Sequence, residues 1–135
     1  MIRPGPLSVP GARAPAAPYS QGYWAPPFVY VSGCVPFDLE TGETVPGGIQ
    51  EQTARVIGNI ERVLMQAGAS LSDVVKTTVY LTDITLSEGM NTAYRAAFGD
   101  HRPARATVQI GPLSRAEFMV EIEAVAWKAH PSDAG

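Results

Sequence analysis

Apolar and polar positions follow two different periods along this chain, and the two periods separate predicted strands from predicted helices. Alternation with many β-branched and aromatic residues predicts strands over residues 19–25, 28–33, 74–81, 106–110 and 118–127. Apolar side chains at three- and four-residue spacing predict helices over residues 49–67 and 86–98. Gly68 and Gly99 follow these helices, where glycine commonly ends a helix. Thr85 and Glu88 have the spacing of a capping box.

The predicted order β-β-α-β-α-β-β is typical of an α+β domain, in which two helices cover one face of a mixed sheet. Polar residues, Asn59 among them, cover the side of the first helix opposite its apolar stripe. In the last strand Phe118 and Ile122 share one face, whereas Trp127 lies on the other face beside two glutamates. No helix remains for that second face, so we expect it to be buried against another subunit.

The 135 residues predict one domain over residues 18–128. A proline-rich segment, residues 1–17, is expected to run extended over the surface, and residues 129–135 form a polar tail. The net charge of −3 and the scattered basic residues disfavour nucleic acid as a partner. The single cysteine excludes an internal disulfide and fits a reducing cytoplasm. We expect no signal peptide and no membrane span.

Three charged residues near the C-terminus are candidates for chemistry. Arg105 follows Pro103-Ala104 at the start of a strand and has the fork geometry that binds a carboxylate, although a structural arginine is the alternative. Glu121 and Glu123 share one face of the last strand. Either could act on a water molecule in a partly dry interface, or form an ion pair between subunits or a solvated rim.

The remaining polar candidates have weaker signals. When each is taken alone, ordinary hydrogen bonding is the favoured interpretation of Tyr19, Ser32 and Asn91. Cys34 has no predicted base beside it, so we expect a structural thiol. The two histidines lie in a loop and in the tail, and we assign them no role. The chain shows no phosphate loop, no zinc-ligand spacing and no Ser-His-Asp arrangement.

Six stretches, taken together and in order, resemble the RidA family, also called the YjgF family. They are APYSQG (17–22), VYVSGCVP (29–36), DVVKTTVYLTD (73–83), MNTAYRAAF (90–98), RPARATV (102–108) and VEIEAVA (120–126). The resemblance spans nearly all of the chain from Pro18 to Trp127, and the succession of PAR and EIEA is its most specific part.

This resemblance implies a chorismate-mutase-like domain that forms a homotrimer around a central β-barrel, with sites in the clefts between neighbouring subunits. Many members are deaminases that hydrolyse reactive 2-imino acids, such as 2-iminopropanoate and 2-iminobutanoate, to 2-oxo acids and ammonia. They use no metal and no organic cofactor. The resemblance also leaves open a larger or pathway-specific substrate of the 2-aminomuconate kind, or a member that only binds ligands, acts as a chaperone or cleaves RNA.

Carried over residue by residue, the resemblance assigns two catalytic positions. Arg105 matches the arginine that holds the substrate carboxylate, and Glu121 matches the acid/base that directs water. The expected substrate-binding residues are Tyr19, Ser32, Gly33, Asn91, Arg105 and Thr107.

Two features depart from the pattern of many deaminating members. Thr107 stands where those members have cysteine, which removes any thiol chemistry and leaves the substrate subgroup open. The hairpin over residues 23–27, YWAPP, is unusually bulky, and we expect it to reshape the pocket for a larger or aromatic-derived imino acid.

Overall fold

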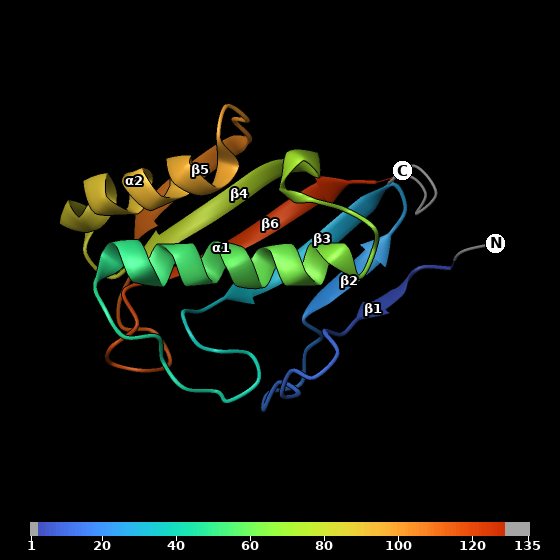
Figure 1. Cartoon of the computed structure of the whole chain (residues 1–135), viewed down its shortest axis with the longest axis horizontal. Helices are drawn as coiled ribbons and strands as arrows, with labels where there is room; N and C mark the ends of the chain where they lie inside the picture. Colours follow the sequence, from blue (N-terminus) through green and yellow to red (C-terminus); the bar gives the residue numbers. More distant parts are fainter. Residues whose placement is uncertain (1–2, 129–135) are drawn as a thin grey trace.

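A computed structural model of the chain describes residues 3–128. One six-stranded sheet forms its centre, with the strand order β1-β2-β3-β6-β4-β5. The strands are β1 (Gly5–Leu7), β2 (Gly22–Ala25), β3 (Phe28–Cys34), β4 (Val74–Leu81), β5 (Ala104–Gln109) and β6 (Val120–Trp127), and the helices are α1 (Ile49–Met65) and α2 (Ser87–Phe98). Only β4 and β5 pair in parallel; the other neighbours are antiparallel (Figure 1). The expected α+β mixed sheet is therefore confirmed.

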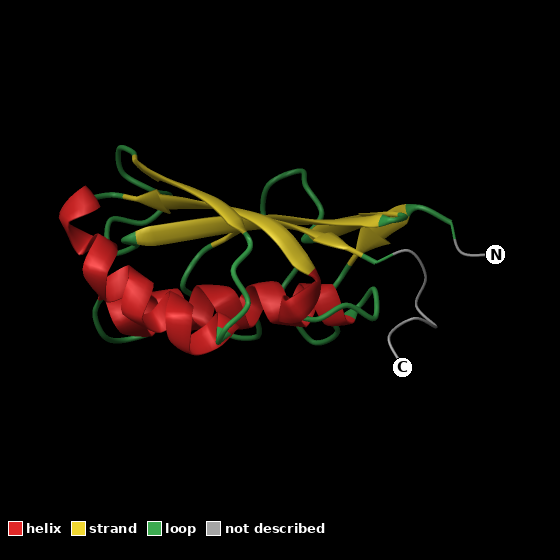
Figure 2. Cartoon of the chain, turned by 90° about the horizontal axis from the view of Figure 1, so that it is seen from above, coloured by secondary structure: helices red, strands yellow, loops and turns green. Residues whose placement is uncertain are grey.

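Both helices lie on the same face of the sheet, and the opposite face carries no helix (Figure 2). The apolar stripe of α1 packs on β3 and β6, and α2 packs beside α1. The buried side chains between the layers include Val29, Ile57, Ile60, Leu64, Val79, Leu81, Met90, Val120 and Ile122. This layer of apolar side chains is the core of the molecule.

The first helix differs from its prediction at its end and on its polar side. It ends at Met65 rather than at residue 67, because the chain turns through Gly68, whose φ of 71° is the left-handed conformation that favours glycine. Asn59 was expected on the solvent side, but only 1% of it is exposed. Its amide group donates to the Val35 and Phe37 carbonyls, which brings it under the chain that follows β3.

The predicted capping box of the second helix is wrong. A 3-10 turn, Ile84–Leu86, precedes α2, and the Asp83 carboxylate accepts hydrogen bonds from the backbone N–H and the hydroxyl of Thr85. Thr85 is therefore held by Asp83 and does not cap α2. The predicted end of α2 at Phe98 is confirmed, and Gly99 follows it with φ of 63°.

Two strands at the edges of the sheet differ from the sequence pattern. β1 was not predicted; it pairs with β2, and Leu7 and Val9 are buried in the core although they lie in the proline-rich segment. β5 begins at Ala104, two residues earlier than expected. It pairs in parallel with β4 at the edge of the sheet. It does not pair with β6, which lies on the other side of β4. The expected tail, residues 129–135, lies outside the described residues.

The open face of the sheet is rich in exposed aromatic side chains. Tyr23 on β2, Phe28 and Tyr30 on β3 and Trp127 on β6 all project from it, and Trp127 is 51% exposed. The alternation expected for β3 and β6 is confirmed, because Val29, Val31 and the alanines of β6 are buried on the helix side. The helix-free face is therefore apolar enough to favour burial.

Candidate functional site

An irregularity between β3 and β6 makes room for the Glu121 carboxylate. The pairing register shifts between Val31 and Cys34, so the β3 backbone bulges opposite β6. The backbone of Gly33 lies against Glu121 so closely that an added Cβ would stand 2.3 Å from a carboxylate oxygen. Gly33 is needed here because of this close approach, since its φ lies outside the left-handed region.

Burial and neighbouring charge change the acidity of three groups around this bulge. Burial, with a smaller contribution from Glu123, raises the pKa of Glu121. Burial also raises the pKa of Tyr19, and the nearby Cys34 and Glu121 add to this rise. The pKa of the Cys34 thiol is raised to about 12 by burial and by Glu121. Cys34 is therefore a neutral thiol at ordinary pH, as expected for a structural cysteine.

The two glutamates of β6 have different partners. Glu123 accepts a short hydrogen bond from the Tyr80 hydroxyl, which raises the pKa of Tyr80. Glu121 has no hydrogen-bond partner among the described residues and lies beside Gly33. Of the two carboxylates, Glu121 is therefore the one that remains available to a water molecule or a ligand. Ser32 lies on the same bulge, and its hydroxyl donates to the Ser20 carbonyl over 2.6 Å.

The second group of candidate residues surrounds Arg105 at the edge of the sheet. The Arg105 guanidinium lies over the Tyr94 ring, 4.9 Å from its centre, and one of its nitrogens is 4.0 Å from the Met90 sulfur. No carboxylate of the described residues forms an ion pair with Arg105. A cavity of about 260 Å³ opens here, lined by Asn91, Tyr94, Arg95, Arg102, Pro103 and Arg105. The arrangement can hold a small carboxylate.

Thr107 lies on the same strand as Arg105 and on the same side of it. Its hydroxyl oxygen is buried and has no hydrogen-bond partner within the described part of the chain. Thr107 pairs with Val79 of β4, and Arg105 pairs with Thr77 of β4. The side chains of Val79 and Thr77 are both buried on the helix side of the sheet. Arg105 and Thr107 therefore face the side of the sheet that carries α2.

These two groups cannot meet within one chain. Arg105 of β5 pairs with Thr77 of β4, and Thr77 pairs with Ala124 of β6. The side chains of Thr77 and Ala124 are both buried on the helix side of the sheet. Glu121 points to the open face, because neighbouring side chains of a strand alternate between faces. One chain therefore carries two separate half-sites: Tyr19, Ser32, Gly33 and Glu121 form one, and Asn91, Arg105 and Thr107 form the other.

The bulky hairpin does not reshape either cavity described here. Tyr23 lies on the open face, and Trp24 is buried in the core, where its indole N–H donates to the Lys128 carbonyl. None of residues 23–27 lines the cavity at Arg105 or the larger one beside Tyr19. His101 has a structural contact, a 2.7 Å hydrogen bond with the Val74 carbonyl.

The larger cavity, about 450 Å³, includes residues that no sequence pattern indicated. Arg115 and the buried Asn59 line it together with Tyr19, Ser32 and Gly33. Arg115 lies in a loop without periodicity, and Asn59 lies on what the helical pattern marks as a polar face. Only the tertiary arrangement brings them together.

Residues 3–128 contain no helix with the length and apolar character needed to cross a membrane. Across the same residues, no three His, Cys, Asp or Glu side chains gather closely enough to hold a metal ion.

Known proteins resemble this chain along most of its length. The family model described as Endoribonuclease L-PSP matches residues 11–128. A RutC family protein of Pyrococcus abyssi is 48% identical over 117 residues, which cover 87% of this chain and 91% of the relative. The mouse 2-iminobutanoate/2-iminopropanoate deaminase is 40% identical over 116 residues, covering 84% of this chain and 85% of the relative.

Solved structures share the fold as well as the sequence. The structure of TdcF from E. coli with bound serine has a TM-score of 0.84 and 31% identity, and the match covers 91% of this chain and 98% of that one. RidA from an Antarctic Psychrobacter has a TM-score of 0.83 and 36% identity over 90% of this chain and 97% of its own. Sequence and fold agree, and the chain belongs to the RidA family, whose model carries the description Endoribonuclease L-PSP.

Proposed function

We propose that this protein hydrolyses reactive 2-imino acids, such as 2-iminopropanoate and 2-iminobutanoate, to 2-oxo acids and ammonia. The name of the mouse relative supports this activity class. The observation that carries the proposal is the pair of half-sites: an arginine without an acidic partner on one, and a half-buried carboxylate without a hydrogen-bond partner on the other. A substrate with a carboxylate beside an imine carbon needs both groups.

Arg105 holds the substrate carboxylate in this proposal. Its guanidinium is already held against Tyr94 and Met90, so little side-chain freedom is lost on binding. A bidentate contact fixes the carboxylate and, through it, the neighbouring imine carbon, which is a positioning effect. Asn91 and Thr107 lie on the same half-site and are proposed to complete the pocket.

Glu121 directs the water molecule. As a base it takes a proton while the water oxygen forms a bond to the imine carbon. It passes this proton to the imine nitrogen, which gives a carbinolamine. It then takes the hydroxyl proton of the carbinolamine and delivers it to nitrogen as the C–N bond breaks, so that ammonia leaves while the carbonyl forms. Its raised pKa supports this role, since proton transfer in both directions works best when the pKa lies near the working pH. Tyr19 is proposed to orient the substrate beside it.

The two half-sites form one site when two copies of the chain associate. They face opposite sides of the sheet, so the arginine of one subunit must meet the glutamate of a neighbour. The aromatic open face favours burial between copies, and a homotrimer around a central barrel would bury it. The single cysteine is compatible with the proposed cytoplasmic location.

Cleavage of RNA is less well supported than imine hydrolysis, although the family description names an endoribonuclease. The chain has a net charge of −3, and phosphate binding depends on basic residues. No metal or cofactor is part of the proposed reaction, since imines hydrolyse in water and a positioned acid/base contributes about 10²–10⁴-fold.

The test is ammonia release from freshly generated 2-imino acids. We expect the wild-type protein to accelerate it and Arg105→Ala to remove the acceleration while the assembly stays intact. Arg55→Ala, an arginine on α1 that lines neither cavity, is the control and should retain activity. Full activity in Arg105→Ala would contradict the proposal.

A further inference from the structure

A cavity of about 450 Å³ borders the half-site that contains Glu121, although Glu121 itself is not among its lining residues. Tyr19, Ser32 and Gly33 belong to both. Beyond them the cavity is bounded by residues 13–17, by the chain after β3, by α1 and by the loop before β6. Its volume lies in the range of about 300–1,000 Å³ that is usual for small-molecule sites. The methyl group of 2-iminopropanoate would fill only a small part of it.

The walls of this cavity are mainly apolar. The large apolar side chains among them are those of Val35, Phe37, Leu39, Val63 and Phe118. The Arg115 guanidinium stacks on both aromatic rings, 5.6 Å from the centre of Phe37 and 5.2 Å from that of Phe118, and it donates to the Thr44 hydroxyl over 3.1 Å. Arg115 therefore holds the aromatic walls in place, and the space between them suits an apolar group.

Asn59 gives the inner wall of this cavity a buried polar group. Its amide nitrogen donates two hydrogen bonds, one to the Val35 carbonyl over 3.2 Å and one to the Phe37 carbonyl over 2.9 Å. The amide oxygen is buried and has no hydrogen-bond donor among the described residues. A buried acceptor without a donor costs free energy, so the cavity is suited to a water molecule or a ligand group that donates to it.

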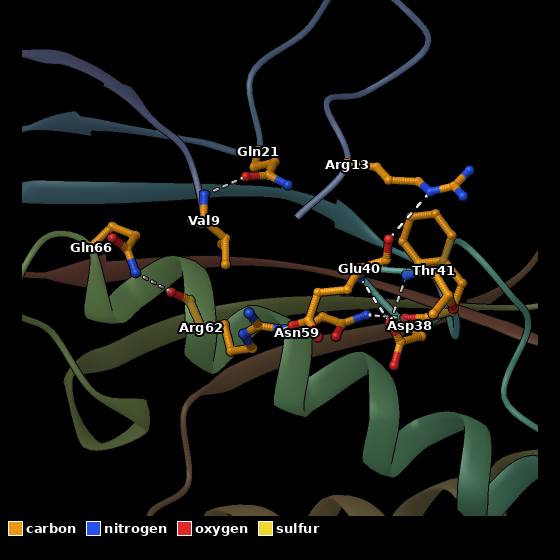
Figure 3. Close-up of polar contacts among 10 residues, drawn as sticks. Val9, Arg13, Gln21, Asp38, Glu40, Thr41, Asn59, Arg62 and Gln66 are labelled. Atoms are coloured by element: carbon orange, nitrogen blue, oxygen red, sulfur yellow. Dashed lines mark hydrogen bonds and ion pairs between the residues drawn. The ribbon is translucent and has the colours of Figure 1, made fainter. Parts of the chain in front are cut away.

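The N-terminal segment forms the outer wall of the cavity. Arg13 extends from it over the loop at residues 38–41, where its Nε donates to the Glu40 carbonyl over 3.3 Å, while Asn59 rises from α1 on the other side of that loop (Figure 3). Ala14, Ala16 and Ala17 line the cavity and are exposed. Small side chains on this wall leave the space open, and larger ones can be placed there without disturbing the core.

We propose that this cavity receives the side chain of the substrate, so that the protein prefers 2-imino acids with bulky, mainly apolar side chains over the alanine-derived one. The inference rests on the proposed function, because the reacting carbon is located by Glu121 and by the arginine of a neighbouring subunit. From there the side chain extends past Gly33 and Cys34 between the aromatic walls. An added methylene in an apolar pocket changes specificity by about tenfold or more.

The experiment compares hydrolysis of imino acids generated from alanine, leucine and phenylalanine. For wild type we expect kcat/KM to be at least about tenfold higher for the two larger substrates. Ala16→Phe and Ser114→Phe place a ring into the cavity from two exposed walls and should remove this preference, because they lower kcat/KM for the two larger substrates more than for the alanine-derived one. Ala54→Phe, on the exposed side of α1, is the matched control and should behave as wild type. Equal rates for all three substrates in wild type, or equal losses in the filled variants, would overturn the inference.

A second readout separates failure of this inference from failure of the proposed function. If wild type hydrolyses none of the imino acids, the proposed function fails, and titration calorimetry with 2-oxo acids then tests the cavity directly. We expect 4-methyl-2-oxopentanoate to bind at least about tenfold more tightly than pyruvate, and Ala16→Phe and Ser114→Phe to abolish the difference. Equal affinity for the two acids in wild type would overturn the inference.

Discussion

Gly33→Ala tests whether the position of the Glu121 carboxylate, rather than its presence, determines activity. A Cβ at residue 33 would lie 2.3 Å from a carboxylate oxygen of Glu121 and 2.8 Å from its carboxyl carbon. Contacts this short do not persist. Because the contacted atoms are the end of a flexible side chain, Glu121 moves and the backbone stays.

The size of the expected effect follows from the geometry. To reach the ordinary contact distance of 3.4 Å or more, the carboxylate must move by about 1 Å. A displacement of that size in a catalytic group costs about 10²-fold in rate, or about 2.7 kcal/mol of transition-state stabilisation. The fold should not be destabilised, because the φ of Gly33 lies in a region that other residues adopt. Replacing glycine by alanine at such a position reduces the conformational entropy of the unfolded chain and so stabilises the fold by about 0.4–1 kcal/mol.

The assay is ammonia release from 2-imino acids, paired with thermal unfolding of the same preparations. Gly58→Ala is the matched control, because an added Cβ on this α1 glycine meets nothing within 4 Å. We expect it to retain activity and gain about 0.5–1 kcal/mol of stability. Full activity in Gly33→Ala, or a loss of activity explained by unfolding alone, would contradict a catalytic role for the position of the Glu121 carboxylate.

Three further variants test separate parts of the account. Burial raises the pKa of Glu121 above its ordinary value of 4.5, so the ionised carboxylate destabilises the folded state. Glu121→Gln should therefore raise the melting temperature above about pH 4.5, and the gain should vanish below that pH in unfolding scans over roughly pH 3.5 to 8. With a pKa of about 12, Cys34 should react slowly with iodoacetamide at pH 8, and Cys34→Ser should retain activity. Tyr30→Lys, on the open face, should dissociate the assembly in sedimentation experiments; unchanged mass would contradict burial of that face.

The sequence allowed accurate prediction where local periodicity determines structure. The apolar stripe of α1 and the β-branched run of β4 were both placed correctly, because each pattern reports which face is buried. β1 escaped prediction because its three residues include Pro6 and follow Pro4, and only pairing with β2 identifies them as a strand. The position of β5 beside β4 is likewise a long-range property that no local pattern encodes.

The sequence supplied candidate residues for the site but not their arrangement. The family resemblance selected Arg105 and Glu121, and neither composition nor spacing shows that their side chains face opposite sides of the sheet. The cavity beside Tyr19 was not predicted at all. Asn59 occupies a helical position that the pattern assigns to solvent, and its burial depends on the chain after β3 crossing over α1.

The most direct test of the shared site is to mix two inactive variants. Arg105→Ala retains Glu121, and Glu121→Gln retains Arg105, so a site that takes one residue from each of two neighbours is rebuilt wherever the right pair meets. In a closed trimer assembled at random from equal amounts, about a quarter of the sites should be intact. We therefore expect ammonia release to return to about a quarter of the wild-type rate after unfolding and reassembly of the mixture. Activity that stays at the level of the separate variants, in a mixture shown to have exchanged subunits, would contradict a site built between two chains.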